Sequence, residues 1–159
     1  MKPKVYVETS VVSYYTGRAS RDVVIAGRQQ STQEFWSMLS SELSPYVSAL
    51  VAKEVNKGAS ELAGKRQDAI ASFPVLRTTP QAELLASAIL DGHGIPAEYP
   101  ENALHIAVAV VAGMDFIVTW NFSHINNPFT KMMIRHVVEN AGYECPEIVS
   151  PDAFLGEET

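Results

Sequence analysis

The chain has 159 residues and carries 18 acidic against 12 basic side chains, a formal net charge of −6. This balance excludes a protein that coats nucleic acid by broad electrostatic attraction, because that mode needs many Lys and Arg side chains to release counterions. It does not exclude a nuclease, since a bound divalent cation supplies positive charge locally. The hydrophobic content of 47% is that of a folded globular protein, and we expect one domain over 1–159.

The sequence indicates a cytoplasmic protein that stays out of membranes. Its one cysteine, Cys145, cannot form an internal disulfide and suits a reducing compartment. The N-terminal segment lacks the long apolar stretch of a secretory signal. The most apolar stretch, 103–114, is interrupted by His105 and Gly113 and is shorter than the roughly 20 residues of a spanning helix.

Short apolar runs alternate with helical patterns along the chain. The expected strands are 4–8, 46–48, 75–79, 115–119 and 147–149. The expected helices are 20–43, 49–57, 60–73, 80–92, 101–113 and 128–142, with a final helical turn at 150–155. This alternation predicts βαβ units, and therefore an α/β fold: a three-layer α/β/α sandwich around a mainly parallel sheet of about five strands.

The long helix 20–43 has a defined start and an inward face in this pattern. Ser20 is expected to cap its first turn. The helical spacing places Val24, Phe35 and Leu39 among the residues that face the core.

Two glutamates interrupt the apolar pattern. Glu8 ends the first strand and precedes Thr9 and Ser10 at the expected start of a helix, where a carboxylate can serve simply as a cap. Glu54 lies four residues after Leu50 and shares the apolar face of its helix. A glutamate on an inward face needs a partner, which is either a structural ion pair or a metal.

Asparagine and histidine side chains occur at two later positions. Asn102 starts the helix 101–113, where it can act as a cap, and His105 in that helix is expected to be a hydrogen-bonded core residue. Asn121 and His124 follow the fourth strand directly. They can form a turn, or they can present a carboxamide and an imidazole to a functional site.

The expected topology brings several of these residues together. In an open parallel sheet, ligands bind beyond the carboxyl ends of the strands, where the strand order reverses. Glu8, Glu54, Asn102 and Asn121 would then line one cleft. Such oxygen-rich clusters suit Mg²⁺ or Mn²⁺ and not Zn²⁺. The sequence contains no phosphate-binding glycine loop, nucleophile elbow or HExxH zinc motif.

Five segments stand out along the chain: VYVETSVVSYYTGR, SRDVVIAGRQQSTQEFW, YVSALVAKEV, ENALHIAVAVVAGMDFIVTWNFSHI and EIVSPDAFL. Together they resemble the PIN-domain family, and more specifically its VapC-like toxin branch. Their order and spacing carry the resemblance, which covers essentially the whole chain. It implies a metal-dependent ribonuclease whose active site has an acid after the first strand, a helical glutamate and two later aspartates.

The resemblance assigns roles residue by residue. Glu8 matches the first acid, with Glu in place of the usual Asp, and Glu54 matches the helical glutamate. Asn102 and His124 stand where the family usually has aspartates, and Asn121 matches the asparagine between them. Because only two of the four positions carry a charge, this site would hold at most about one divalent ion, and weakly.

The leading hypothesis is a Mg²⁺- or Mn²⁺-dependent endoribonuclease that acts as the toxin of a type II toxin–antitoxin module. Glu8, Glu54, Asn102 and Asn121 would hold the metal. His124 would hydrogen-bond the phosphate or assist proton transfer.

The same hypothesis names residues that contact the RNA substrate. The family's small hydroxyl residue matches Thr9 or Ser10, and Arg18 or Arg21 would hold the RNA backbone. The resemblance also implies a homodimer and an antitoxin segment that lies in the cleft. The alternative hypothesis, which Asn102 and His124 favour, is a catalytically degenerate PIN-fold module that binds RNA or a protein partner without cleavage.

Overall fold

The computed structural model describes residues 1–156. The strands are β1 Lys4–Val7, β2 Ser44–Ser48, β3 Val75–Leu76, β4 Phe116–Val118 and β5 Glu147–Val149. The helices are α1 Thr9–Thr16, α2 Val23–Leu39, α3 Ala49–Glu54, α4 Ser60–Ile70, α5 Pro80–Asp91, α6 Pro100–Val111 and α7 Pro128–Asn140, followed by the 3₁₀ turn η1 Pro151–Phe154.

The five strands form a parallel sheet in the order β3-β2-β1-β4-β5. β1 is its central strand, and Val5, Tyr6 and Val7 are all fully buried, as expected for a strand that is covered on both faces. The chain runs outward from β1 through β2 and β3, then returns to β4 on the other side of β1. The order therefore reverses between β1 and β4, which places the expected ligand-binding edge at their carboxyl ends.

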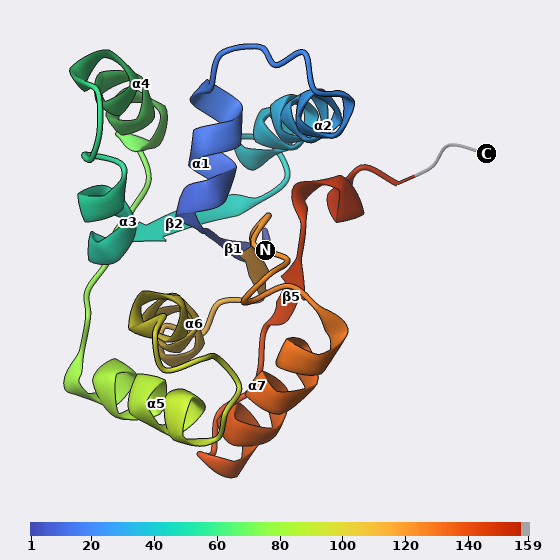
Figure 1. Cartoon of the computed structure of the whole chain (residues 1–159). Helices are drawn as coiled ribbons and strands as arrows, with labels where there is room; N and C mark the ends of the chain where they lie inside the picture. Colours follow the sequence, from blue (N-terminus) through green and yellow to red (C-terminus); the bar gives the residue numbers. More distant parts are fainter. Residues whose placement is uncertain (157–159) are drawn as a thin grey trace.

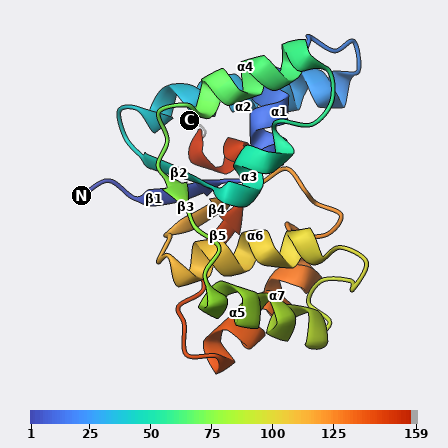
Figure 2. The same cartoon turned by 90° about the vertical axis from the view of Figure 1, so that its left-hand side faces the viewer.

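Helices cover both faces of the sheet. Figures 1 and 2 show α1, α2 and α4 on one face and α5, α6 and α7 on the other. The short α3 follows β2 directly at the carboxyl end of that strand. The predicted three-layer α/β/α arrangement and the parallel five-stranded sheet are both confirmed.

The start of α2 differs from the sequence expectation. Its cap is Asp22, whose side chain accepts a first-turn backbone hydrogen bond, and the predicted cap, Ser20, instead accepts a bond from the Asp22 N–H. Val24 is 62% exposed, so its predicted inward position was wrong, whereas Phe35 and Leu39 are buried as predicted. The physical reason is that α2 contributes fully buried side chains only along its second half, so its first turn lies on the surface.

Two other elements are shorter than the sequence pattern indicated. The helix after Ser48 ends at Glu54 and not at Lys57, and the strand that begins at Val75 has two residues. Thr79, at the end of that expected strand, instead caps α5 with its side chain. Within residues 1–156, no helix combines the length and apolarity needed to cross a bilayer.

Candidate functional site

Glu8 lies immediately beyond β1 and is the N-cap of α1. Its Oε2 accepts a hydrogen bond from the Ser10 N–H (3.1 Å), and its Oε1 accepts from the Ser10 hydroxyl (2.5 Å) and the Thr119 hydroxyl (2.6 Å). The capping interpretation is therefore confirmed. A carboxylate offers about four lone-pair positions, so these three bonds leave Glu8 able to accept one more ligand.

Glu54 ends α3 and points toward the same place. Its Oε1 accepts hydrogen bonds from the Thr9 hydroxyl (2.5 Å) and from Nε2 of His105 (2.7 Å), while no hydrogen bond to its Oε2 occurs within the described chain. Burial raises the pKa of Glu54, but the hydrogen bond and charge of His105, the Thr9 bond and the charge of Lys57 outweigh it and leave this pKa below its ordinary value. Glu54 is thus held as an anion with one oxygen unengaged.

A buried chain of hydrogen bonds orients Glu54. Tyr6 Oη contacts Ser48 Oγ (2.7 Å) and His105 Nδ1 (2.6 Å), and Ser48 Oγ also accepts a bond from the Val51 N–H. With a neutral imidazole, Ser48 donates to Tyr6, Tyr6 donates to Nδ1, and Nε2–H donates to Glu54. With an imidazolium, Nδ1–H donates to Tyr6 and Tyr6 donates to Ser48.

In both protonation states the Nε2 proton of His105 points at Glu54. His105 is therefore a hydrogen-bonded core histidine, as predicted, that fixes a carboxylate and keeps no free lone pair toward the site. Burial raises the pKa of the Tyr6 phenol, so Tyr6 stays protonated and acts in this chain as a neutral donor.

The two glutamates and His105 form a compact cluster. One carboxylate oxygen from Glu8, one from Glu54 and a ring nitrogen of His105 all lie within 4.8 Å of one another. Across residues 1–156, no Lys or Arg nitrogen lies within 4 Å of either carboxylate. Two carboxylates this close repel each other unless a cation or a proton lies between them. The donor set, with unengaged carboxylate oxygens, fits a hard divalent cation.

Asn102 and Asn121 lie together beside this cluster. Asn121 Nδ2 is 3.5 Å from Asn102 Oδ1, and the Asn121 N–H donates to the hydroxyl of Thr119, which in turn donates to Glu8. Asn102 does not cap α6, because the helix begins one turn earlier with Tyr99 at the cap position. The capping alternative for Asn102 was therefore wrong, and its carboxamide faces Asn121 instead.

His124 lies at the edge of the site. Asn121 Oδ1 accepts a hydrogen bond from the His124 N–H (3.0 Å), which confirms the turn expected here. The His124 ring stacks on Tyr99 with centroids 4.0 Å apart and an interplanar angle of 28°. Within the described residues, the His124 ring makes no hydrogen bond to Glu8 or Glu54.

The four residues expected to contact substrate separate into two places. Thr9 and Ser10 lie inside the cluster, where each hydroxyl holds one of the two glutamates. Arg18 and Arg21 follow the far end of α1, about 12 Å along the helix from its start. Arg18 is also 3.8 Å from a surface carboxylate, that of Glu61.

Sequence reasoning missed the supporting residues Tyr6, Ser48 and Thr119. Each is a hydroxyl-bearing residue that is buried within a strand or directly after one, where an aliphatic side chain would pack without needing a partner. Buried polar groups need hydrogen bonds. A hydroxyl in a buried position therefore signals a hydrogen-bond partner. The sequence does not show which residue that partner is, because the strands become neighbours only in the folded chain.

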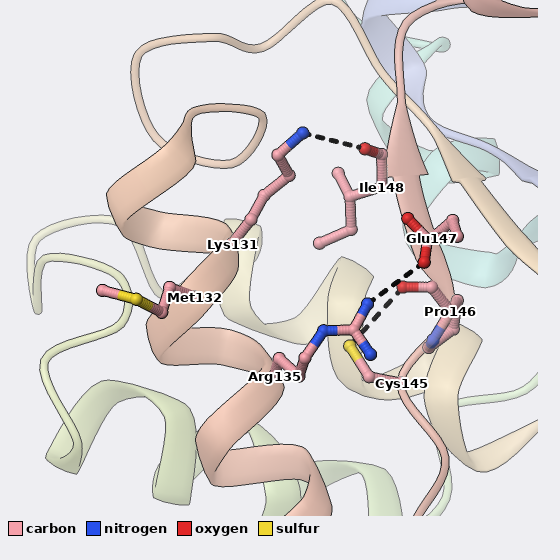
Figure 3. Close-up of a pocket in the computed structure, with 7 residues that line it drawn as sticks. All are labelled: Lys131, Met132, Arg135, Cys145, Pro146, Glu147 and Ile148. Carbon is pink, nitrogen blue, oxygen red and sulfur yellow. Dashed lines mark hydrogen bonds and ion pairs between the residues drawn. The ribbon is translucent and has the colours of Figure 1, made fainter.

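A separate hollow of about 260 Å³ lies between α7 and the amino-terminal end of β5 (Figure 3). Its basic groups are engaged, because Lys131 donates to the Ile148 carbonyl and Arg135 pairs with Glu147. The Cys145 thiol lines it, with a pKa raised by burial. This hollow lies at the opposite end of the strands from Glu8 and does not contribute to the acidic cluster.

Comparison with solved structures places this fold among known ones. The chain is similar to a chain in the crystal structure of VapBC2 from Rickettsia felis, which is bound to a DNA fragment from the VapBC2 promoter. The match covers 92% of this chain and 98% of that chain, with a TM-score of 0.59 and 11% sequence identity. No family model and no curated protein matches the chain. At this identity the likeness shows the fold alone, the PIN-like α/β fold that the sequence resemblance predicted.

Proposed function

We propose that the protein is a Mg²⁺- or Mn²⁺-dependent endoribonuclease and the toxin of a type II toxin–antitoxin module in the cytoplasm. The observation that carries this proposal is the pair of carboxylates, Glu8 and Glu54, held within 4.8 Å of each other without a Lys or Arg partner. The PIN-like fold supports it.

Glu8 and Glu54 would hold the cation, with the carboxamides of Asn102 and Asn121 completing its surroundings. When bound, the cation supplies a Lewis acid that offsets charge on the scissile phosphate and makes water more acidic. Thr119 and His105 keep the two carboxylates aimed at a common point, so the acceptors are in place before a cation arrives.

His124 and the basic residues would act on the RNA itself. The imidazole of His124 would donate a hydrogen bond to a phosphate oxygen or assist a proton transfer. Arg18 and Arg21, at the far end of α1, would contact the RNA backbone away from the cleaved bond. An antitoxin segment that covers the acidic cluster would keep the toxin inactive, and we propose a homodimer as its working form.

The direct test is RNA cleavage by the purified protein in Mn²⁺, with Glu8→Gln and Glu54→Gln as the informative variants. We expect each to lower the cleavage rate by at least about 100-fold, because each removes charge from the cation site. Glu147→Gln is the matched control, since Glu147 is an exposed glutamate that pairs with Arg135 at the opposite end of the strands. Undiminished cleavage by both site variants would refute the assigned roles.

A second candidate function is supported by the carboxamides. Asn102 and Asn121 bond to each other and carry no charge, which favours a PIN-fold module that binds RNA or a protein partner without cutting. RNA binding by the wild type, with no cleavage at saturating Mn²⁺, would establish this alternative.

A further inference from the structure

Arg28 is held within a group of aromatic rings next to the candidate site. Its guanidinium carbon lies over the rings of Tyr14 (5.9 Å), Trp120 (5.5 Å) and Phe122 (5.1 Å), measured to the ring centroids. Nη1 also donates a hydrogen bond to the Tyr14 hydroxyl (3.1 Å). These contacts are cation–π interactions, which hold the guanidinium without neutralising it.

The charge of Arg28 is not paired with any carboxylate in the described chain. The ion pairs within residues 1–156 involve other residues, and one of its five N–H donors has a hydrogen-bond partner there. In a chain with a net charge of −6, this is a half-buried cation fixed in position beside an acidic site. Such a group is suited to bind an anion that arrives from outside.

Trp120 connects this aromatic group to Glu8. Its backbone N–H donates to the Ser10 hydroxyl (2.9 Å), which donates to Glu8, and its indole N–H donates to Thr32 in α2 (2.8 Å). The Arg28 group is therefore one side chain away from the carboxylate. Phe122 comes next to Asn121 in the chain and is 40% exposed, so its ring is open to a ligand.

Aromatic rings also lie on the other side of the same turn. Phe122 contacts Arg28 of α2, whereas His124 stacks on Tyr99 at the start of α6, and Tyr99 is 41% exposed. α2 and α6 lie on opposite faces of the sheet (Figures 1 and 2). The turn at 120–124 thus presents one partly exposed aromatic group toward each face, and Asn121 belongs to the same turn.

We propose that Arg28 and Phe122 form a nucleotide subsite beside the cleaved bond of a single-stranded RNA. The Phe122 ring stacks on one base, and the Arg28 guanidinium binds the adjoining phosphate. The Tyr99–His124 stack, at the start of α6, receives a second base. This inference rests on the proposed function, because it assigns a binding place to the RNA substrate of that function.

The chemistry of the subsite selects an unpaired strand. An aromatic side chain can stack only on a base that is unpaired and unstacked. Single strands and loops expose such bases, and a duplex does not. Binding by an acidic protein must also rely on local contacts, because the chain lacks the basic surface for broad attraction to a duplex.

The test measures binding apart from cleavage. A labelled single-stranded RNA is titrated in EDTA and followed by fluorescence anisotropy, with a duplex of the same sequence as a second probe. We expect Arg28→Met and Phe122→Leu each to weaken single-strand binding about tenfold, and Arg28→Lys to fall between Arg28→Met and the wild type. Arg135→Met is the matched control, because Arg135 pairs with Glu147 at the opposite end of the sheet.

The possible outcomes separate this inference from the proposed function. Wild-type affinity in both Arg28→Met and Phe122→Leu overturns the subsite, and so does a wild type that does not bind the single strand. A thermal unfolding curve for each variant verifies folding, and Arg28→Lys, which keeps the charge over the rings, serves if Arg28→Met does not fold. If Arg28→Met loses binding while the wild type does not cleave in Mn²⁺, the subsite stands and the nuclease assignment fails.

Discussion

The site has two halves that differ in charge and in how firmly they are held. In the acidic half, hydrogen bonds of 2.5–2.6 Å join Glu8, Glu54 and His105 to buried or half-buried hydroxyl groups, and a bond of 2.7 Å joins His105 to Glu54. In the amide half, Asn102 and Asn121 are half-buried, are uncharged, and contact each other at 3.5 Å. Glu8 and His105 of the first half are buried, whereas both residues of the second half are half-buried, at a helix start and in a turn.

This difference separates the residues that stabilise the fold from the residues that set the affinity for a cation. A buried polar network is costly to disturb, because each buried group that loses its partner stays desolvated. A neutral amide pair that is only half-buried can change at a smaller cost, because water can replace the lost partner. We therefore expect substitutions in the acidic half to lower stability, and substitutions in the amide half to change cation affinity.

The largest stability effect should come from His105→Leu. This change removes the partner of both Tyr6 and Glu54, and we expect it to lower the free energy of unfolding by about 3 kcal/mol. Asn121→Ala, its counterpart in the amide half, should cost about 1 kcal/mol. Urea denaturation of both variants measures the difference, and equal losses would remove the distinction between the halves.

Tyr6→Phe should have the next largest effect. It leaves the ring in place but deprives Ser48 and His105 of a hydrogen bond, at an expected cost of about 2 kcal/mol. Tyr46 is the matched control, because it pairs with Tyr6 across β1 and β2 and its hydroxyl has no hydrogen bond within residues 1–156. A Tyr46→Phe variant that is destabilised as much as Tyr6→Phe would show that the buried hydroxyl network does not matter.

Asn102→Asp tests the amide half by adding a negative charge to it. The new carboxylate would give the amide half a charge, and we expect Mn²⁺ to bind about tenfold tighter, with faster cleavage. Asn140→Asp adds the same charge on the exposed end of α7 and should change neither property. If both variants bind Mn²⁺ alike, the effect is one of net charge and Asn102 does not adjoin the cation.

The smallest effect concerns acid stability. Because the folded-state pKa of Glu54 lies below its ordinary value of about 4.3, its contribution is present above that pH and is lost as the pH falls through the folded-state pKa. Glu54→Gln should therefore lose less stability than the wild type between about pH 5 and pH 3. Thermal unfolding across this range provides the measurement, with Glu61→Gln expected to keep the wild-type slope.

The sequence was sufficient for the fold and for the acidic pair. Alternation of apolar strands and helices predicts the parallel sheet, and an inward-facing Glu54 signals a partner because buried carboxylates require one. Once β1 is central, Glu8 and Glu54 converge because both follow the carboxyl ends of adjacent strands.

The parts that the sequence did not predict depend on contacts across the chain. The partners of Tyr6 lie 42 and 99 residues away in the sequence, so no local pattern reveals that its hydroxyl joins Ser48 to His105. The exposed Val24 follows a helical period that is compatible with burial, and only the placement of α2 shows that its first turn lies outside the core.

Calorimetric titration of Mn²⁺ tests the central claim most directly, namely that Glu8 and Glu54 together make a cation site. We predict about one ion bound per chain at millimolar or lower concentration, with binding lost in Glu8→Gln and Glu54→Gln and retained in Glu61→Gln. A wild type that takes up no Mn²⁺ at these concentrations, or site variants that bind it as well as the wild type does, would contradict the claim.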